Sequence, residues 1–283
     1  MTFADINIRD PFIVLEDDTY YMYGTRGAEC WNESYGLDVY TSTDLETWSE
    51  PTEVFTPPVD FWANKNFWAP EVHKYNGAYY MFASFKADGV CRGTQILRSD
   101  SPMGPFVLHS DGPVTPRDWE CLDGTLYVDK NGVPYMIFCH EWVQVKDGEM
   151  CVMRLTDDLK AAAEEPKLLF KASEPSWANK GVEDYVTDGP FMHRLADGTL
   201  IMLWSSIAQE AYVEAIAASD NGDITGNWKQ LDELLFDKDG GHGMVFRDKT
   251  GDLRFIMHSP NKELQERPVL ITVREENGTL VKA

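Results

Sequence analysis

The feature that most constrains the fold is a strand-and-turn pattern that recurs five times within 283 residues. Each repeat opens with an anchor segment, passes through a tight turn and returns as a second strand rich in aromatic residues. The anchor segments are Arg9-Asp10-Pro11-Phe12-Ile13, Ala69-Pro70-Glu71-Val72-His73, Leu122-Asp123-Gly124-Thr125-Leu126, Thr187-Asp188-Gly189-Pro190-Phe191 and Gly241-His242-Gly243-Met244-Val245. The equivalent positions are taken as Asp10, Ala69, Asp123, Asp188 and His242, at separations of 59, 54, 65 and 54 residues.

Turns rich in Gly, Asn and Asp join the first two strands of every repeat. They lie at Glu16-Asp17-Asp18, Asn76-Gly77, Asn131-Gly132, Asp197-Gly198 and Thr250-Gly251. Asn-Gly and Asp-Gly between such strands are strong hairpin signals. A third strand follows in each repeat, and a fourth, outer strand is clearest from Trp48 to Phe55. We therefore predict a five-bladed β-propeller that occupies residues 1–283 as one domain; a two-sheet sandwich would leave the regular spacing unexplained.

The composition restricts the classes of molecule that the protein is expected to bind. The formal net charge of −22 disfavours nucleic acid and anionic membrane surfaces, and is compatible with a neutral oligosaccharide or polysaccharide. No apolar run reaches the roughly 18 residues of a membrane span. The first residues lack the features of a signal peptide, so as the sequence stands we expect a cytoplasmic protein, unless a leader has been removed. The five cysteines have no metal-site or redox spacing and are read as mostly buried free thiols.

Three carboxylates at one repeat position indicate chemistry. In a propeller the first strand of each blade lines the central channel, so Asp10, Asp123 and Asp188 would face one cavity. Carboxyl groups that lie close together cannot all ionise easily, and their pKa values separate. One then serves as a base and another as an acid, which is what glycosidic bond hydrolysis requires. The alternative is that these are ordinary turn aspartates with local hydrogen bonds.

Taken together, these segments resemble glycoside hydrolase family 43, and the resemblance extends over essentially the whole chain. The residues that carry the resemblance are Arg9-Asp10-Pro11 with Tyr20-Tyr21-Met22-Tyr23-Gly24-Thr25, Phe67-Trp68-Ala69-Pro70-Glu71-Val72-His73, Leu122-Asp123-Gly124-Thr125-Leu126, Thr187-Asp188-Gly189-Pro190, Gly240-Gly241-His242-Gly243-Met244 and His258-Ser259-Pro260-Asn261-Lys262 with Arg267-Pro268. Each tripeptide alone is weak, but their order and spacing together are specific.

The resemblance implies an inverting glycosidase. Asp10 matches the general base that activates water, and Asp123 matches the residue that orients the acid and tunes its pKa. Asp188 stands where the family usually has a glutamate as general acid. We predict Asp188 as the acid, with Glu183 in the preceding loop as the alternative. The glutamate-to-aspartate change also keeps open a non-catalytic, carbohydrate-binding propeller.

The resemblance further implies a metal ion near His242, often calcium, held among waters with a structural and electrostatic role. No cofactor is required for the chemistry itself. Calcium normally prefers oxygen ligands, so the competing interpretation is a buried histidine that hydrogen-bonds across the channel. His242 is accordingly a predicted metal ligand with an ordinary structural alternative.

Five further residues are predicted to bind substrate. Trp68 is a sugar-stacking platform, Trp31 and Phe61 would wall the pocket, His140 would flank it, and Arg267 would hydrogen-bond sugar hydroxyls.

The expected substrates are non-reducing-end furanosides or xylosides of plant-type polysaccharides or oligosaccharides. An α-L-arabinofuranosidase is favoured over a β-xylosidase or a β-galactofuranosidase. A retaining fructan hydrolase is a weaker alternative, because the chain opens with Arg9-Asp10-Pro11-Phe12 and lacks the Asn-Asp-Pro-Asn type of motif.

Overall fold

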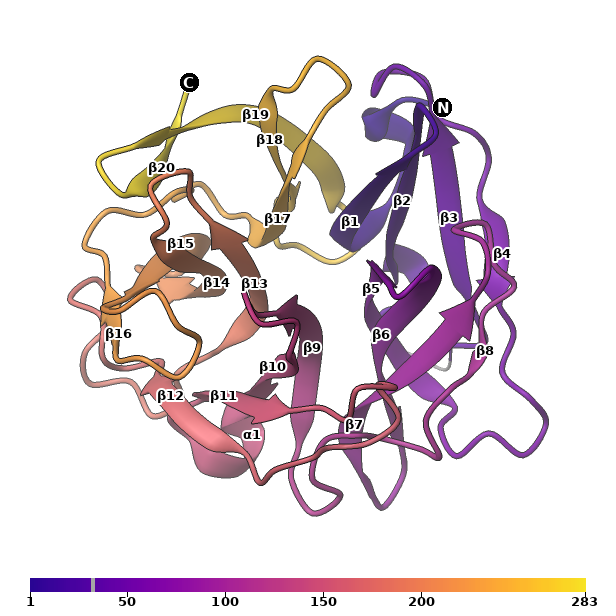
Figure 1. The fold of residues 1–283 in the computed structure, drawn as a ribbon, viewed down its shortest axis with the longest axis horizontal. Coiled ribbons are helices and arrows are strands. Elements are labelled where there is room, and N and C mark those ends of the chain that lie inside the picture. The colour runs from indigo at the N-terminus through magenta and orange to yellow at the C-terminus, as the bar shows by residue number, and fades with distance from the viewer. Residues whose placement is uncertain (32–33) are drawn as a thin grey trace.

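The chain forms a five-bladed β-propeller, which confirms the predicted fold class. The computed structural model describes residues 1–31 and 34–283, and these contain five sheets of four antiparallel strands arranged around a central axis (Figure 1). Every blade is built from four consecutive strands, so neither end of the chain lends a strand to a distant blade. Blade one and blade five hold the two ends of the chain and share no sheet, so contacts between the two blades must close the ring.

The blades share one layout, with strands running outward from the axis in chain order. The strands are β1 (Ile8–Glu16), β2 (Thr19–Arg26), β3 (Leu37–Ser42) and β4 (Thr52–Phe55); β5 (Lys65–Tyr75), β6 (Ala78–Ala87), β7 (Val90–Ser99) and β8 (Val107–Leu108); β9 (Cys121–Val128), β10 (Pro134–His140), β11 (Glu149–Arg154) and β12 (Lys167–Lys171); β13 (Asp188–Arg194), β14 (Leu200–Ala208), β15 (Ala211–Ser219) and β16 (Trp228–Gln230); β17 (Gly241–Arg247), β18 (Leu253–Ser259), β19 (Arg267–Glu276) and β20 (Thr279–Lys282). Three short helical turns complete the described elements: η1 (Phe3–Asp5), η2 (Gly27–Glu29) and α1 (Trp142–Val145).

The inner strands β1, β5, β9, β13 and β17 surround the axis, and neighbouring members contact each other around the ring (Figure 1). The predicted hairpin turns join each inner strand to its partner, since the turn residues at Asn76 and Asp17 adopt positive φ and Gly77 follows with φ 81°. The outer strand of blade one is shorter than predicted. It begins at Thr52, and Trp48 forms only an isolated bridge to Ser42.

Each inner strand has a β-bulge at its start, and one residue in each bulge has a left-handed backbone. These residues are Asp10 (φ 55°), Ala69 (φ 46°), Asp123 (φ 57°), Gly189 (φ 54°) and His242 (φ 51°). Left-handed φ is uncommon for residues other than glycine, and bulges redirect side chains. The bulge therefore aims one chosen side chain per blade toward the axis, and glycine leaves the blade-four position without one.

The five left-handed bulge positions correct the predicted alignment of the repeats. The equivalent of Asp10 in blade four is Gly189, and Asp188 lies one residue earlier, at the position of Arg9. The signal was present in the sequence, because Gly189-Pro190-Phe191 matches Asp10-Pro11-Phe12 better than the segment that begins at Asp188. Asp188 therefore reaches the centre from a different backbone position than Asp10 and Asp123.

A repeated hydrogen bond, here called the anchor girdle, joins four of the five described bulges to the second strand of the preceding blade. The acceptor is a polar side chain on the second strand of one blade, and the donor is the anchor N–H of the next blade. The bonds are Ala69 N to Thr25 Oγ1 (2.8 Å), Asp123 N to Ser84 Oγ (2.9 Å), His242 N to Ser205 Oγ (2.7 Å) and Asp10 N to His258 Nδ1 (3.2 Å). The girdle satisfies buried N–H groups that the bulges remove from the ladder.

Blade three departs from the girdle. Cys139 occupies the position where the other blades carry Thr25, Ser84, Ser205 and His258. Thiol sulfur is a weak acceptor. The anchor N–H of Gly189 instead donates to Asp123 Oδ2 at 3.0 Å. A carboxylate of the channel thus replaces the missing hydroxyl and ties blade three to blade four.

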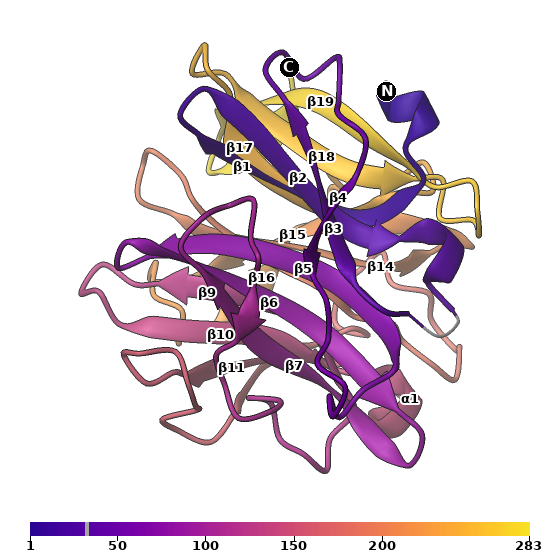
Figure 2. The same cartoon turned by 90° about the vertical axis from the view of Figure 1, so that its right-hand side faces the viewer.

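The seam between blades five and one, where β17 and β1 lie side by side (Figures 1 and 2), is sealed by polar contacts. Arg9 Nη1 pairs with the buried Glu266 Oε1 at 2.8 Å, and Asn7 Nδ2 donates to the Glu266 carbonyl at 2.9 Å. Arg267 Nε donates to the Ala4 carbonyl at 2.8 Å. This corrects the prediction that Arg267 binds sugar: its guanidinium is committed to the backbone at the seam.

Apolar side chains from neighbouring blades form the core between the sheets. Phe61 belongs to this core, because its ring packs against Phe55, Phe67 and Phe85 at centroid distances of 5.7, 5.8 and 5.1 Å. The prediction that Phe61 walls the substrate pocket is therefore wrong. All five cysteines are free thiols, and four of them are buried. Within residues 1–31 and 34–283, no helix has the length and apolarity needed to cross a membrane.

Removing one girdle acceptor should destabilise the propeller. Ser84→Ala leaves the buried Asp123 N–H without its partner, and we expect a loss of about 1–3 kcal/mol in the free energy of unfolding. Urea denaturation would show a lower midpoint at an unchanged slope. Ser176→Ala, which removes an exposed hydroxyl paired with Asp232, is the matched control and should change stability by less than about 0.5 kcal/mol. Equal losses in both variants would contradict a girdle.

Candidate active site

A cavity of about 510 Å³ opens at the end of the channel where the inner strands begin. Its size is typical of small-ligand sites. Its walls include five carboxylic side chains, which are Asp10, Asp123, Glu141, Asp188 and Glu263, and four aromatic ones, which are Trp31, Trp68, Trp142 and Tyr212. His242 and Arg9 also line it. The structure therefore brings all three predicted catalytic aspartates to one cavity, together with Trp31, Trp68 and His242.

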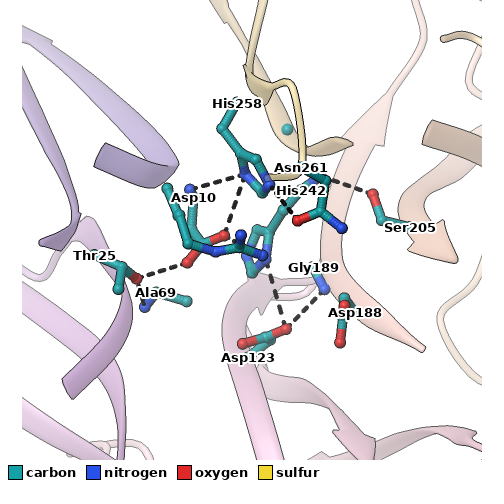
Figure 3. A network of polar contacts seen from close by, with 12 residues as sticks. Asp10, Thr25, Ala69, Asp123, Asp188, Gly189, Ser205, His242, His258 and Asn261 are labelled. Atoms are coloured by element: carbon teal, nitrogen blue, oxygen red, sulfur yellow. Dashed lines mark hydrogen bonds and ion pairs between the residues drawn. The ribbon is translucent and has the colours of Figure 1, made fainter. Parts of the chain in front are cut away.

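Asp10 is held as an acceptor from several sides. Its Oδ2 accepts the Thr25 hydroxyl at 2.6 Å, and its Oδ1 lies 3.2 Å from His242 Nδ1 and 3.4 Å from His258 Nδ1 (Figure 3). Burial alone would raise the pKa of this carboxyl, but His242, His258 and Arg9 together with the Thr25 hydrogen bond outweigh it, and the pKa of Asp10 falls below its usual value. Asp10 is therefore the carboxylate that stays ionised.

Asp123 is more buried than Asp10, at 4% against 9% exposed, and has the opposite electrostatics. Its Oδ2 accepts the Gly189 N–H at 3.0 Å and lies 3.6 Å from His242 Nδ1 (Figure 3). Burial and the charge of nearby Asp10 hold the pKa of Asp123 well above its ordinary value. Because one oxygen binds the backbone next to Asp188, this side chain fixes the segment that carries the third carboxyl group.

Asp188 stands at the cavity wall, where its Oδ2 accepts the Tyr212 hydroxyl at 3.1 Å. Burial and the neighbouring Asp123 raise the pKa of Asp188 to about 7, against an ordinary 3.8. A carboxyl group with this pKa holds a proton near neutral pH and can release it during a reaction. The cavity thus pairs an ionised carboxylate with a protonated one, the division of roles that glycoside hydrolysis uses.

His242 lies between the carboxylates and is fixed by its backbone. Its N–H donates to Ser205 Oγ at 2.7 Å, and Ser205 in turn donates to the buried Glu214 at 2.8 Å. His242 Nδ1 faces Asp10 and Asp123, whereas Nε2 is buried without a hydrogen-bond partner. A ring nitrogen that lies between two carboxylates supports the alternative to a metal ligand, in which His242 is a structural histidine that hydrogen-bonds across the channel.

The metal prediction at His242 has limited support from the residues around it. The orphan Nε2 is one free donor atom, but the described residues contain no group of three or more His, Cys, Asp and Glu side chains placed to hold an ion. Calcium takes six to eight oxygen ligands, as a rule mostly from protein. The side chains present do not form such a cage, so calcium stays a prediction and no chemical step is assigned to it.

Two tryptophans form one wall of the cavity. The rings of Trp31 and Trp68 meet edge to face with centroids 5.3 Å apart, and Trp68 Nε1 donates to the Cys30 carbonyl at 2.6 Å. The guanidinium of Arg92 stacks on Trp68 at 3.8 Å from its centroid, and that of Arg9 lies 5.6 Å from the Trp31 centroid. Fixed aromatic faces are suited to the apolar faces of sugar rings.

Two other sequence predictions fall outside the cavity. His140 stacks on Trp119 with centroids 4.2 Å apart, and its nitrogens contact Glu149 (3.0 Å) and Gln144 (2.9 Å), so it supports the wall from behind. Glu183, the alternative acid, has a side chain that is 82% exposed and pairs with Lys146. That exposure places the Glu183 carboxylate outside the cavity that Asp188 lines.

Sequence reasoning missed several residues that complete the site. The sequence motif that contains Arg9 predicts no role for it, although Arg9 lines the cavity one residue before Asp10. His258 could have been found, because aligning the second strands places it with Thr25 and Ser205. Tyr212 is the second residue of the third strand of its blade, and no repeat pattern singles it out. Its role depends on a contact between two separate strands.

The charge of the cavity selects against acidic ligands. Among the described lining residues, five are carboxylic and Arg9 is the single arginine or lysine. A uronic acid would meet this negative wall at close range, whereas a neutral sugar would not, and a positively charged, oxocarbenium-like transition state would be favoured. The partner suggested by the net charge, a neutral saccharide, is thus consistent with the local electrostatics.

Comparisons with known proteins agree with this geometry. The sequence profile of the glycosyl hydrolases family 43 matches residues 4–276. A solved structure of an endo-arabinase from Bacteroides thetaiotaomicron VPI-5482 superposes with a TM-score of 0.91 at 43% identity and covers 98% of each chain. A thermostable family-43 glycoside hydrolase superposes with a TM-score of 0.86 at 22% identity over 98% of this chain and 92% of its own, and shows the shared fold.

Two curated relatives match part of the chain. The extracellular endo-α-(1→5)-L-arabinanase 1 of Bacillus subtilis is 27% identical over 171 residues, which are 56% of this chain and 52% of the relative. The extracellular exo-α-(1→5)-L-arabinofuranosidase ArbA of Cellvibrio japonicus is 26% identical over 176 residues, which are 56% of this chain and 46% of the relative. The chain spans about half the length of these curated relatives.

The raised pKa of Asp188 should cost stability at neutral and alkaline pH. The folded carboxyl keeps its proton up to a pKa of about 7, whereas the unfolded one loses it near 3.8, so ionisation favours unfolding as the pH rises from 4 to 7. Asp188→Asn should therefore match the wild type near pH 4 and exceed it by about 1–3 kcal/mol at pH 8, a value discounted because the group faces the cavity. Thermal unfolding at both pH values measures this difference. Asp60→Asn, at an exposed position, is the matched control. A gain for Asp188→Asn that is equal at both pH values would contradict ionisation of Asp188 as its cause.

Proposed function

Because the chain belongs to the glycosyl hydrolases family 43 and is thus an O-glycoside hydrolase, we propose that it cleaves α-L-arabinofuranosidic bonds with inversion. The observation that carries the mechanism is the pairing in one cavity of Asp10, whose pKa is lowered, with Asp188, whose pKa is raised to about 7. The substrate class rests on the similarity to arabinan-cleaving enzymes, among which the endo-arabinase of Bacteroides thetaiotaomicron is 43% identical over 98% of the chain.

Asp10 is the proposed general base. A water in the cavity would give its proton to the ionised Asp10 carboxylate and attack the anomeric carbon from the face opposite the leaving group. Thr25 and His242 contact the two oxygens of Asp10, which fixes the direction in which the carboxylate presents its lone pairs. A base positioned in this way contributes roughly 10²–10⁴-fold to the rate.

Asp188 is the proposed general acid. Its proton would go to the glycosidic oxygen as the bond to the anomeric carbon breaks, so that the leaving group departs as a neutral alcohol. Asp123 contributes through the Gly189 N–H at 3.0 Å and through the negative surroundings that raise the pKa of Asp188. Asp123 thus positions and tunes the acid and does not itself need to contact the sugar.

The sugar is proposed to be neutral and to stack on the wall of Trp31 and Trp68. We favour removal of terminal arabinofuranose from the non-reducing end, as the sequence predicts. Endo cleavage is the specific alternative, because the relative that matches over nearly the whole chain is an endo-arabinase. A second sugar, β-xylose, is kept because the Xylosidase/arabinosidase 43A of Humicola insolens is 26% identical over 49% of the chain.

A substrate panel tests this proposal. We expect kcat/KM on an aryl α-L-arabinofuranoside to exceed that on the matching β-xyloside and β-galactofuranoside by roughly tenfold or more. On α-1,5-linked arabino-oligosaccharides, release of arabinose alone indicates exo action, and early release of mixed oligosaccharides indicates endo action. Proton NMR should show the β anomer first, as inversion requires. Binding by calorimetry with no turnover on any glycoside would instead identify a non-catalytic binding propeller.

Loss of the proposed base should abolish turnover while leaving the fold intact. For Asp10→Asn we expect kcat to fall by roughly 10³-fold, because the amide cannot accept a proton from water but can still accept the Thr25 hydroxyl. Steady-state kinetics with circular dichroism as a fold check measures this. Glu183→Gln removes an exposed carboxylate outside the cavity and should keep activity within about twofold, provided that Asp188 and not Glu183 is the acid. Full activity of Asp10→Asn would rule out the assignment.

A further inference from the structure

The proposed acid is one carbon shorter than the glutamate that the family resemblance leads us to expect, so its reach depends on how firmly its side chain is held. Among the described residues, the one hydrogen bond to the Asp188 side chain comes from the Tyr212 hydroxyl, at 3.1 Å to Oδ2. Tyr212 lies on β15, the third strand of the same blade, and its side chain lines the cavity. A tyrosine is therefore positioned to decide where the acid points.

Tyr212 itself is held rigidly. Its backbone N–H donates to Asp239 Oδ1 at 3.3 Å and its carbonyl accepts the Gly240 N–H at 2.9 Å. Its ring stacks on His258 with centroids 5.5 Å apart and 20° between the planes. On another side the ring packs on Gly241 so closely that an added Cβ there would lie 2.9 Å from it. A ring fixed on several sides gives its hydroxyl one direction.

The same ring links the acid to the base. His258, against which Tyr212 stacks, accepts the Asp10 N–H at 3.2 Å and lies 3.4 Å from Asp10 Oδ1. The chain of contacts runs from Asp188 through Tyr212 and His258 to Asp10, and it joins blades four, five and one. The separation between an acid and a base determines whether a water fits between the base and the sugar.

The hydroxyl can act only as a donor toward the ionised acid. Burial and the nearby carboxyl groups of Asp188 and Asp10 raise the pKa of Tyr212 well above its ordinary value, so its proton is retained. Since the hydroxyl donates to Oδ2, the acidic proton of Asp188 is carried by the other oxygen, Oδ1. A carboxylic acid whose Oδ2 is occupied in this way presents one defined O–H to the substrate.

We infer that Tyr212 is a positioning residue that fixes the side chain of Asp188, directs its proton to Oδ1 and thereby allows an aspartate to serve as the acid. The inference rests on the proposed function, because it assumes that Asp188 is the general acid. It goes beyond that function in assigning the acid's orientation, and its distance from the base, to a residue outside the three aspartates.

The effect on pH dependence has a defined sign. The charged or titratable groups that face Asp188 are Asp123, His242, Asp10 and Tyr212, from β9, β17, β1 and β15. The Tyr212 hydrogen bond stabilises the ionised carboxylate, so its removal should raise the pKa of Asp188. The basic limb of the kcat/KM profile, which reports the acid of the free enzyme, should then move to higher pH by about 0.5–1 unit in Tyr212→Phe.

The decisive experiment compares Tyr212→Phe with the wild type on two aryl glycosides of the sugar that the wild type cleaves best. Phenylalanine keeps the ring stack on His258 and deletes only the hydroxyl. With a poor leaving group, which needs protonation, we expect kcat/KM to fall by roughly 10–100-fold. With a dinitrophenyl leaving group, which departs without an acid, the fall should be under about threefold.

Tyr23→Phe is the matched control. Tyr23 is fully buried and its hydroxyl also donates one hydrogen bond, to the Pro102 carbonyl, but it does not line the cavity. This variant should lower thermal stability without changing the leaving-group dependence or the basic limb. Asp188→Glu provides a second measurement, because a longer acid should reduce the effect of deleting the Tyr212 hydroxyl when the two changes are combined.

The outcomes separate this inference from the proposed function. Equal losses on both leaving groups with an unmoved basic limb would show that Tyr212 is merely structural and would overturn the inference. A wild type without activity on arabinofuranosides but active on xylosides would overturn only the proposed sugar, and the comparison would be made on xylosides. A wild type inactive on every glycoside would overturn the acid role of Asp188, and the inference with it.

Discussion

The anchor girdle is the interaction on which the rest of the structure depends. Each bulge needs a left-handed residue to turn its side chain toward the axis, and this backbone leaves an N–H group that the sheet does not satisfy. Thr25, Ser84, Ser205 and His258 accept these N–H groups across the blade boundaries. The hydrogen bonds that hold neighbouring blades together therefore also aim the central side chains, so fold and site share the same bonds.

Blade three shows how closely the fold and the site are linked. Where Cys139 provides no good acceptor, Asp123 takes the Gly189 N–H, and the carboxyl group that completes the ring also sits beside the proposed acid. Asp123 therefore has a structural role that a neutral amide could partly fill and an electrostatic role that it could not. Similarly, His258 closes the ring onto blade one and contacts the base through the same imidazole nitrogen.

The arrangement has a cost in stability. Three carboxyl groups enclosed in one cavity oppose each other's ionisation: burial raises the pKa of Asp188 to about 7 and holds that of Asp123 well above its ordinary value. At Asp10, His242 and Thr25 help to outweigh this cost, because they stabilise the charged form. The result is an ionised carboxylate and a protonated one within one preorganised cavity, which is the requirement of acid and base catalysis.

The sequence by itself determined the architecture and most of the central residues. The repeat length, the hairpin turns and the aromatic strands specified five blades, because these signals are local and recur. The repeats also located Asp10, Asp123, Asp188 and His242. Tertiary structure decided what local signals cannot encode. It assigned Arg267 to the seam and Phe61 to the core, whereas the register of blade four, where Gly189 and not Asp188 occupies the bulge, was already encoded in Gly189-Pro190-Phe191. Tyr212 and His258 gained their roles only when strands far apart in the chain met around one axis, since hydrogen bonds depend on distance in space and not on sequence separation.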